Sequence, residues 1–295
     1  MKHKLLGTVY LIIAVLIWGS TFVAQSVGMD LIGPFTFQTF RCLLAVLFLI
    51  PAIAVLEHQD MRTYFRKWLD KKLWFGGVLC GIALFAAASL QQVSLVHTDA
   101  GKAGFLTALY VVLVPVIGLF FRKSLQTHVA FSIVLAVMGS YLLADMTGGS
   151  INVFDLMLLG SAFCFAIQIT LVDHFAPLVD CLRLNCIQCL VTLALSGTAM
   201  LLTETPQMDA ILRCWLPIGY AGILSMGVAY SLQILGQEKV EPTTASIIMS
   251  MESVIAVLSG WLVLNETMTT RELLGCLLMF IALILSQIPF PRKNA

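Results

Sequence analysis

The sequence contains few charged residues. Of its 295 residues only 11% are Asp, Glu, Lys or Arg, whereas 59% are hydrophobic. Soluble globular domains carry about 25% charged residues, so this chain lacks the side chains that a water-facing surface requires. Its net charge of +1 also provides no basic field for nucleic acid. The composition therefore excludes an ordinary soluble domain, speaks against a nucleic-acid partner, and predicts a protein embedded in the lipid bilayer.

Sequence signatures of catalysis and metal binding are missing as well. The chain has no H-E-x-x-H, no G-x-S-x-G and no ATP-binding P-loop. Cys186 and Cys189 form a single C-x-x-C pair, without the second pair or the His spacing that zinc sites use. We interpret the eight cysteines as small residues of a membrane core and not as a redox or metal site. We expect no enzyme activity, no metal, no cofactor and no primary, ATP-driven transport by this chain alone.

Long apolar runs are abundant. A helix that spans the bilayer needs about 20 mostly apolar residues, and the sequence predicts ten such helices. They lie near 5–24, 34–56, 73–94, 99–121, 128–145, 154–172, 182–203, 215–236, 243–264 and 272–290. The predicted fold class is an all-α integral membrane protein with ten transmembrane helices.

The distribution of Lys and Arg predicts the orientation of these helices. Cytoplasmic loops carry an excess of both residues. With a cytoplasmic N-terminus, the inner side receives thirteen: Lys2, Lys4, Arg62, Arg66, Lys67, Lys71, Lys72, Arg122, Lys123, Arg183, Lys239, Arg292 and Lys293. The outer side receives Arg213 and Arg271, plus Arg41 and Lys102 inside helices. We therefore expect a multi-pass protein of the cell membrane with both termini in the cytoplasm.

The polar segment 57–72 is predicted to lie on the cytoplasmic surface, partly as a short helix. Two interpretations are open. It is either a solvated, positively charged loop or a binding patch for anionic lipid.

The two halves of the chain resemble each other. A shift of 145 residues places Gly77 on Gly222, Gln92 on Gln237, Thr98 on Thr243 and Ala100 on Ala245, and a shift of 147 places Trp18 on Phe165. Five helices per half is an odd number, so the second copy enters the membrane from the opposite side. The sequence thus predicts two inverted five-helix repeats, residues 1–146 and 150–291, an architecture common among secondary transporters.

Small residues recur at three- or four-residue spacing in several predicted helices. Close helix packing in lipid needs such residues. We interpret them as packing faces: Gly77, Gly81 and Ala88; Ala100, Gly104 and Ala108; Ser132, Ala136 and Ser140.

Three segments carry a family resemblance. They read A-V-L-I-W-G-S-T-F from Ala14, T-D-A-G-K-A-G-F-L-T-A-L-Y-V-V-L-V-P from Thr98, and A-S-I-I-M-S-M-E-S-V from Ala245, which is followed by W-L-V-L-N-E. The chain resembles the EamA-like family of the drug/metabolite transporter superfamily over essentially its whole length. This resemblance implies ten helices, two repeats, and export or import of amino acids, other metabolites or toxic compounds by alternating access.

Two departures from the family pattern limit what the resemblance implies. Ser253 stands where the family commonly has proline, so a break in the ninth helix is not implied there. The first helix contains no carboxylate, so the proton-coupling Glu of the related four-helix exporters has no counterpart.

Glu252 is the sharpest candidate site residue. It lies about nine residues into the run 243–264, close to mid-membrane at 1.5 Å per residue. A charge there costs about 2.5–3.5 kcal/mol, so the side chain should face protein or a cavity. Glu252 either contacts solute or couples transport to protons, or it is a protonated or hydrogen-bonded residue that holds helices together.

Two cations are predicted near the outer mouth. Arg41 and Lys102 could bind a carboxylate of a solute, or extend to the headgroups of the bilayer. Arg41 lies deeper, which favours a buried partner. Because only these two cations lie at membrane depth, the sequence favours a neutral, zwitterionic or amphipathic solute over a phosphorylated one.

The other candidates are polar or aromatic residues within the helices. Gln168 is interior and a candidate for a cavity, whereas Gln92 and Gln237 lie near helix ends, where an amide more often satisfies loop carbonyls. The aromatic residues Trp18, Phe105, Tyr110 and Tyr230 are more typical of packing. Trp18 is the exception, because the resemblance implies that this part of the first helix lies beside the cavity. Tyr110 and Tyr230 remain translocation-path candidates.

Pro115 removes one backbone hydrogen bond inside the fourth helix and crowds the carbonyl of Val111. It is a candidate hinge or a static bend.

The sequence predicts a secondary transporter, most simply an exporter of small metabolites such as amino acids or amphipathic compounds. A nucleotide-sugar or sugar-phosphate carrier of the same superfamily and a non-transporting receptor or scaffold are the alternatives. Proton coupling and the oligomeric state stay open at this point.

Overall fold

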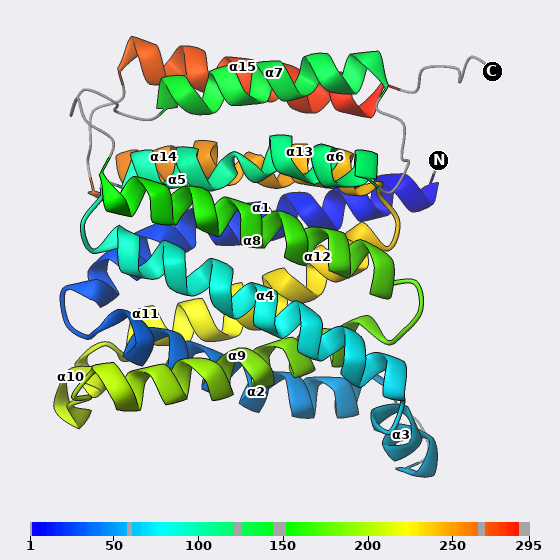
Figure 1. Cartoon of the computed structure of the whole chain (residues 1–295), viewed down its shortest axis with the longest axis vertical. Coiled ribbons are helices and arrows are strands. Elements are labelled where there is room, and N and C mark those ends of the chain that lie inside the picture. Colours follow the sequence, from blue (N-terminus) through cyan, green and yellow to red (C-terminus); the bar gives the residue numbers. More distant parts are fainter. Residues whose placement is uncertain are drawn as a thin grey trace.

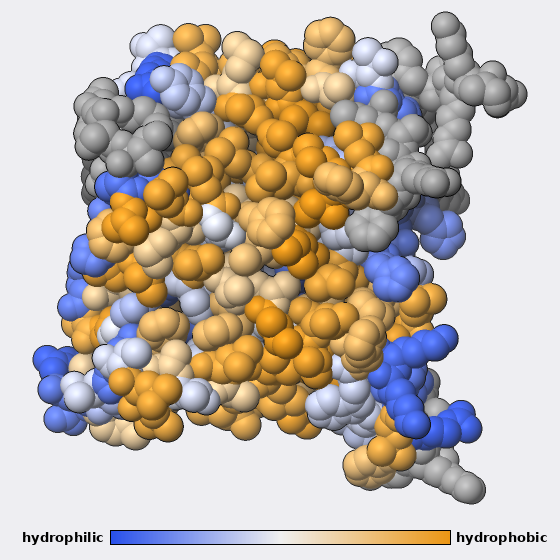
Figure 2. Space-filling view, viewed as in Figure 1, coloured by the Kyte–Doolittle hydropathy of each residue, from blue (hydrophilic) through white to orange (hydrophobic). Residues whose placement is uncertain are grey.

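The computed structural model describes residues 2–57, 61–98, 100–120, 126–143, 152–264 and 269–288, and within these ranges the secondary structure is entirely helical. Nine helical spans in these ranges are long and apolar enough to cross a membrane, and Thr127–Leu143 is a shorter apolar helix. Figure 1 shows them side by side with similar directions. An apolar band covers the visible face between hydrophilic edges at the helix ends (Figure 2).

The first half of the chain begins with the long helices α1 (Lys2–Met29) and α2 (Pro34–Glu57). Its remaining elements are α3 (Met61–Trp68), α4 (Lys71–Leu95), α5 (Ala100–Ala108), α6 (Tyr110–Phe120) and α7 (Thr127–Leu143). The Asp70 side chain caps α4 by accepting a hydrogen bond from the backbone N–H of Lys72. The helix α3 confirms the short helix expected within 57–72.

The second half begins with α8 (Val153–Phe175) and α9 (Cys181–Thr203). It continues with α10 (Met208–Arg213), α11 (Trp215–Gly219), the π-helix η1 (Tyr220–Ala229), α12 (Tyr230–Gln237), α13 (Pro242–Ser250), α14 (Glu252–Leu264) and α15 (Thr270–Gln287). Capping boxes begin α8 and α15, and Pro242 stands in the first turn of α13. All ten predicted apolar runs are therefore helical over the residues that the structure describes.

Two of these spans are interrupted near their middle. The fourth predicted span divides into α5 and α6 at Leu109, and the ninth divides into α13 and α14 at Met251. At Met251 the backbone N–H bonds the carbonyl of Ile248 at 3.1 Å, which tightens the turn. Pro115 lies inside α6, beyond the interruption. The ninth span is interrupted although Ser253 stands there in place of proline.

The eighth span contains a ten-residue π-helix, a rare conformation that is often found at functional sites. The buried amide of Asn185 in α9 supports it. Its Nδ2 donates to the carbonyl oxygens of Met226 and Gly227 at 3.0 and 3.1 Å and to Ser231 Oγ at 2.8 Å. A polar side chain from a neighbouring helix thus satisfies backbone groups that irregular winding exposes, as the lipid interior requires.

Helix packing follows a two-fold pattern that agrees with inverted repeats. In the repeat, α1 corresponds to α8, and α4 corresponds to η1 together with α12. The helix α4 packs on α8, and correspondingly η1 and α12 pack on α1. The contact of α4 with α9 corresponds to that of η1 with α2, and α2–α9 and α7–α15 each join equivalent helices of the two halves. Figure 1 places the α7–α15 pair at one edge and α2 with α9 at the opposite edge.

Glycines allow the closest helix contacts. A Cβ at Gly77 or Gly81 of α4 would lie 2.5 Å from Ile187 or 2.6 Å from Val191 of α9, which confirms the predicted packing face on this helix. At Gly222 of η1 the obstacle is backbone, because a Cβ would lie 2.7 Å from the carbonyl oxygen of Arg41. This contact sets how α2 lies against η1, and with it the position of Arg41, one of the candidate site residues.

We expect Gly222→Ala to destabilise the protein by about 1–3 kcal/mol, the cost of overpacking a dense interior, and to lower its thermal unfolding midpoint in detergent. Gly219→Ala is the matched control, since no atom lies within 4 Å of its added Cβ. This control should be neutral or slightly stabilising because alanine favours helix. Equal midpoints for the two variants would contradict the role assigned to Gly222.

Candidate functional site

A cavity in the centre of the helix bundle gathers most of the predicted site residues. Six of them line it: Trp18, Arg41, Tyr110, Gln168, Tyr230 and Glu252. Lys102 belongs to α5, but its side chain lies outside the described part of the structure. Pro115 is buried in α6 and is not among the residues that line the cavity. The helices α1, α2, α4, α6, α8, η1, α12, α13 and α14 all contribute to the wall.

The two interrupted spans meet at Glu252. This residue is the first of α14, directly after the interruption at Met251, and Tyr110 is the first of α6, directly after the interruption at Leu109. The Tyr110 hydroxyl donates to Glu252 Oε1 at 3.1 Å. Glu252 is 8% exposed and stands in the first turn of a half-helix, where the helix dipole favours negative charge. Each interruption is thus followed by a polar side chain, and these two side chains, Tyr110 and Glu252, meet in the bundle.

Arg41 occupies another part of the cavity wall, where amides surround it. Its Nη1 donates to Gln25 Oε1 at 3.0 Å, and its Nη2 donates to Gln38 Oε1 at 2.8 Å. Its Nε and the Nε2 of Gln38 are buried without a hydrogen-bond partner. Among the residues described, neither Arg41 nor Glu252 forms an ion pair. Arg41 therefore has one buried donor, its Nε, that no described protein group satisfies.

Aromatic rings form the apolar part of the site. The rings of Trp18 and Tyr230 make an edge contact with centroids 4.9 Å apart, and those of Tyr110 and Phe165 lie 6.4 Å apart. Trp18 and Phe165 are equivalent positions in the two repeats, so each repeat supplies one of them. The buried indole N–H of Trp18 has no partner and is a further unsatisfied donor at the cavity.

A row of amides closes the side of the cavity between α8, α9 and α12. Gln233 Nε2 donates to Gln168 Oε1 at 3.2 Å and to Gln237 Oε1 at 2.9 Å. Gln168 Nε2 donates to Gln188 Oε1 at 3.3 Å, and Gln188 Nε2 donates to Asn185 Oδ1 at 2.8 Å. Gln168 is thus both a cavity residue and a structural one.

Sequence reasoning missed several polar residues of the site. Gln25, Gln91 and Gln233 line the cavity, and Gln38 holds Arg41. Amide side chains within the apolar runs could have indicated these residues from the sequence. Gln38, for example, precedes Arg41 by three residues, which places both side chains on one helix face. Gln233 and Gln237 have the corresponding four-residue spacing.

The cavity is narrow in this conformation. Its volume is about 50 Å³, which is room for a few water molecules. No group of three or more His, Cys, Asp or Glu side chains that could hold a metal ion occurs in the described ranges. The arrangement offers a cation, a carboxylate, aromatic faces and unpaired amide donors, the features with which a site binds a small solute that carries charges of both signs.

Comparison with known proteins agrees with this architecture. The chain is 29% identical over 285 residues to an uncharacterized transporter of Archaeoglobus fulgidus, covering 96% of this chain and 86% of that protein. It is 22% identical over 292 residues to the uncharacterized transporter YoaV of Bacillus subtilis, covering 95% and 96% of the two chains. One solved crystal structure shares the fold with a TM-score of 0.78 at 17% identity, over 95% of this chain and 96% of that one.

The family model of the EamA-like transporters matches twice, over residues 5–144 and 153–287. These two matches span nearly the whole sequence. The chain, a multi-pass membrane protein, belongs to the EamA-like transporter family.

Proposed function

We propose that this chain is a secondary transporter that exports small zwitterionic or amphipathic metabolites, such as amino acids, by alternating access. The observation that carries the proposal is a pair of ionisable side chains of opposite sign in one buried cavity: Arg41 and Glu252 line the same space, and no ion pair joins them. Burial of an uncompensated charge is costly. A solute with a carboxylate and an ammonium group would compensate both charges, while Trp18, Tyr230 and Phe165 contact its apolar part.

The cavity favours this class of solute over phosphorylated ones. Carriers of nucleotide sugars and sugar phosphates need several Lys or Arg to neutralise phosphate. Arg41 is the single basic residue in the described cavity wall, and the carboxyl group of Glu252 belongs to the same wall. For the alternative of a non-transporting receptor, the discriminating observation is solute flux in vesicles that contain only the purified protein.

An asymmetry between the repeats supports alternating access. At the end of the bundle where the chain begins, α8 contacts α12 and α13. The equivalent pairs in the other half, α1 with α4 and with α5, do not pack to that extent among the described residues. Inverted repeats that exchange such arrangements would open the cavity first to one side and then to the other.

The repeat-related amides Gln92 and Gln237 show the same asymmetry, because only Gln237 has a hydrogen-bond partner. Gln237 Nε2 donates to the carbonyl oxygen of Ile169 at 3.0 Å. Both amide atoms of Gln92 are buried without a partner. The position equivalent to Ile169 is Phe22, which lines the cavity. In our proposal Gln92 donates to the Phe22 carbonyl in the alternate state, when the contact of Gln237 with Ile169 is released.

We expect Glu252→Gln to reduce export of the transported solute by about tenfold or more, because a hydrogen bond to a charged group contributes about 1.5–3 kcal/mol. The measurement compares metabolites accumulating outside bacterial cells that produce the native protein or the variant. Glu238→Gln, a change at a partly exposed surface position, is the control. Native-like export by Glu252→Gln at every pH tested would exclude both a solute-binding and a proton-coupling role for Glu252.

Arg41→Gln should weaken transport of a carboxylate-bearing solute by about tenfold, through loss of a charge-assisted hydrogen bond. It should affect the corresponding amine, which lacks the carboxylate, much less. The assay is competition by the two compounds for uptake into vesicles, with Arg213→Gln as the control at an exposed position of α10. An equal loss for both compounds would mean that Arg41 stabilises the fold and does not contact the carboxylate.

Gln92→Leu and Gln237→Leu should shift the conformational equilibrium in opposite directions. The first removes an unsatisfied buried amide from this conformation and the proposed contact from the other one; the second breaks the contact with Ile169. Since an unsatisfied buried group costs about 1–3 kcal/mol, we expect a fivefold or larger change in labelling of Thr21→Cys by a membrane-impermeant maleimide. Labelling should rise with Gln92→Leu and fall with Gln237→Leu. A change in the same direction for both would contradict the exchange.

A further inference from the structure

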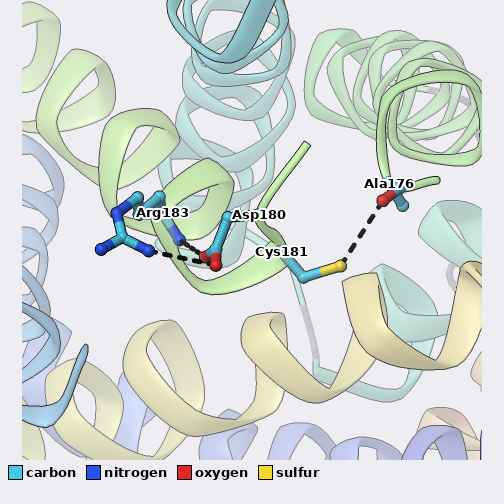
Figure 3. A network of polar contacts seen from close by, with 4 residues as sticks. All are labelled: Ala176, Asp180, Cys181 and Arg183. Carbon is cyan, nitrogen blue, oxygen red and sulfur yellow. Dashed lines mark hydrogen bonds and ion pairs between the residues drawn. The ribbon is translucent and has the colours of Figure 1, made fainter. Parts of the chain in front are cut away.

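The short helix α3 is fixed to the bundle by one buried arginine. Arg183, near the start of α9, is fully buried, and its guanidinium carbon lies 5.0 Å from the ring centre of Tyr64 and 5.3 Å from that of Trp68. Its Nη1 and its backbone N–H both donate to the Asp180 carboxylate, at 3.1 and 3.0 Å. Figure 3 shows the arginine side chain folded back on Asp180. Cation–π contacts of this kind strengthen when they are desolvated.

The loop that precedes α9 is fixed at the same place. Cys181 Sγ donates to the Ala176 carbonyl oxygen at 3.7 Å, which joins the start of α9 to the end of α8 (Figure 3). Tyr64 and Trp68 are four residues apart, so they occupy one face of α3. That face packs on the bundle and sets the direction in which the other faces of α3 point.

The rest of this corner of the protein exposes apolar side chains and, next to them, basic side chains. Phe65 of α3 and Leu69, the residue after α3, are 58% and 78% exposed, and each directly follows one of the half-buried aromatic residues Tyr64 and Trp68. Arg66 is exposed, as are Lys71 and Lys72 at the start of α4. Figure 2 shows hydrophilic and apolar surface side by side at the corner where Figure 1 places α3. An exposed apolar stripe next to basic residues is typical of a helix that lies in the membrane interface.

The aromatic residues at this corner fit the same depth. Trp74 is 44% exposed, and its indole N–H donates to the backbone carbonyl of Trp68 at 2.7 Å. Tryptophan is enriched at the level of the lipid headgroups. Residues 64–72 contain four basic side chains and one acidic one, Asp70, which caps α4.

We propose that α3 and the first turn of α4 form a binding surface for the anionic headgroups of phospholipids in the adjacent leaflet. Phe65 and Leu69 enter the interface, and Arg66, Lys71 and Lys72 contact the phosphates. Because Arg183 connects α3 to α9, lipid bound at this surface stabilises the packing of α9, a helix that supplies the amides supporting both the cavity and η1. This role is independent of which solute the protein carries.

The test measures the thermal unfolding midpoint of the purified full-length protein in mixed micelles as phosphatidylglycerol is titrated. A ligand that binds the folded but not the unfolded state raises the midpoint, and above its dissociation constant the rise grows with the logarithm of the ligand concentration. The midpoint of the native protein should therefore start to rise once the lipid concentration passes the dissociation constant. In Lys71→Gln/Lys72→Gln the lipid concentration that gives the same rise should increase about tenfold, since each basic residue near an anionic surface adds to the attraction.

Lys2→Gln/Lys4→Gln is the matched control, because it removes the same charge at the same end of the bundle but from α1. It should titrate like the native protein. Three results would each overturn the proposal: an equal rise with zwitterionic phosphatidylcholine, an equal loss of affinity in the two double variants, or a rise of the same size with inorganic phosphate alone. The last result would identify a soluble anion as the ligand.

Discussion

The structure depends above all on the lack of hydrogen-bonding solvent in the bilayer. Every backbone or side-chain polar group at that depth has to find its partner inside the protein. The long amide row from Gln237 to Asn185 and the support of η1 by Asn185 largely meet this requirement, with Gln233 Oε1 as the unpaired atom of the row. It is also the reason why the unpaired atoms matter. The Nε of Arg41, the indole N–H of Trp18 and the amide of Gln92 are left without partners around the central cavity or close to its walls.

The inverted repeat explains how a small set of helices produces this site. Each repeat contributes one interrupted span, and the interruptions at Leu109 and Met251 place Tyr110 and Glu252 within hydrogen-bonding distance. Each repeat also contributes an aromatic residue from its first helix, Trp18 or Phe165. The repeats are not identical in detail, because Thr107 stands 145 residues before Glu252 and no cation stands at the position equivalent to Arg41. An arginine and a carboxyl group therefore stand in the site without symmetry, which supports our proposal of a solute with two different ends.

Much of the fold could be predicted because lipid imposes a simple rule on sequence. Twenty apolar residues in a row have few alternatives to a spanning helix, so all ten spans were predictable to within a few residues. The interruptions were not. Met251 and Leu109 are ordinary apolar residues, and neither lies at a proline; Pro115, the visible candidate, lies inside a continuous helix. The π-helix was equally hidden, because its carbonyls are satisfied by Asn185, more than thirty residues earlier in the chain.

The sequence by itself determined that the chain is a membrane protein, how many apolar spanning runs it has, that it consists of two related halves, and that Glu252 and Arg41 are ionisable residues at a depth where a charge is costly. These properties follow from composition, run length and the cost of burying charge, all of which act locally. Only the tertiary structure decided that six candidate residues share one cavity, that Gln168 belongs to a hydrogen-bonded amide row while Gln92 is unpaired, and that Arg183 anchors α3. Such contacts join residues far apart in the chain, and the relative rotation of packed helices, which decides them, leaves no local pattern in the sequence.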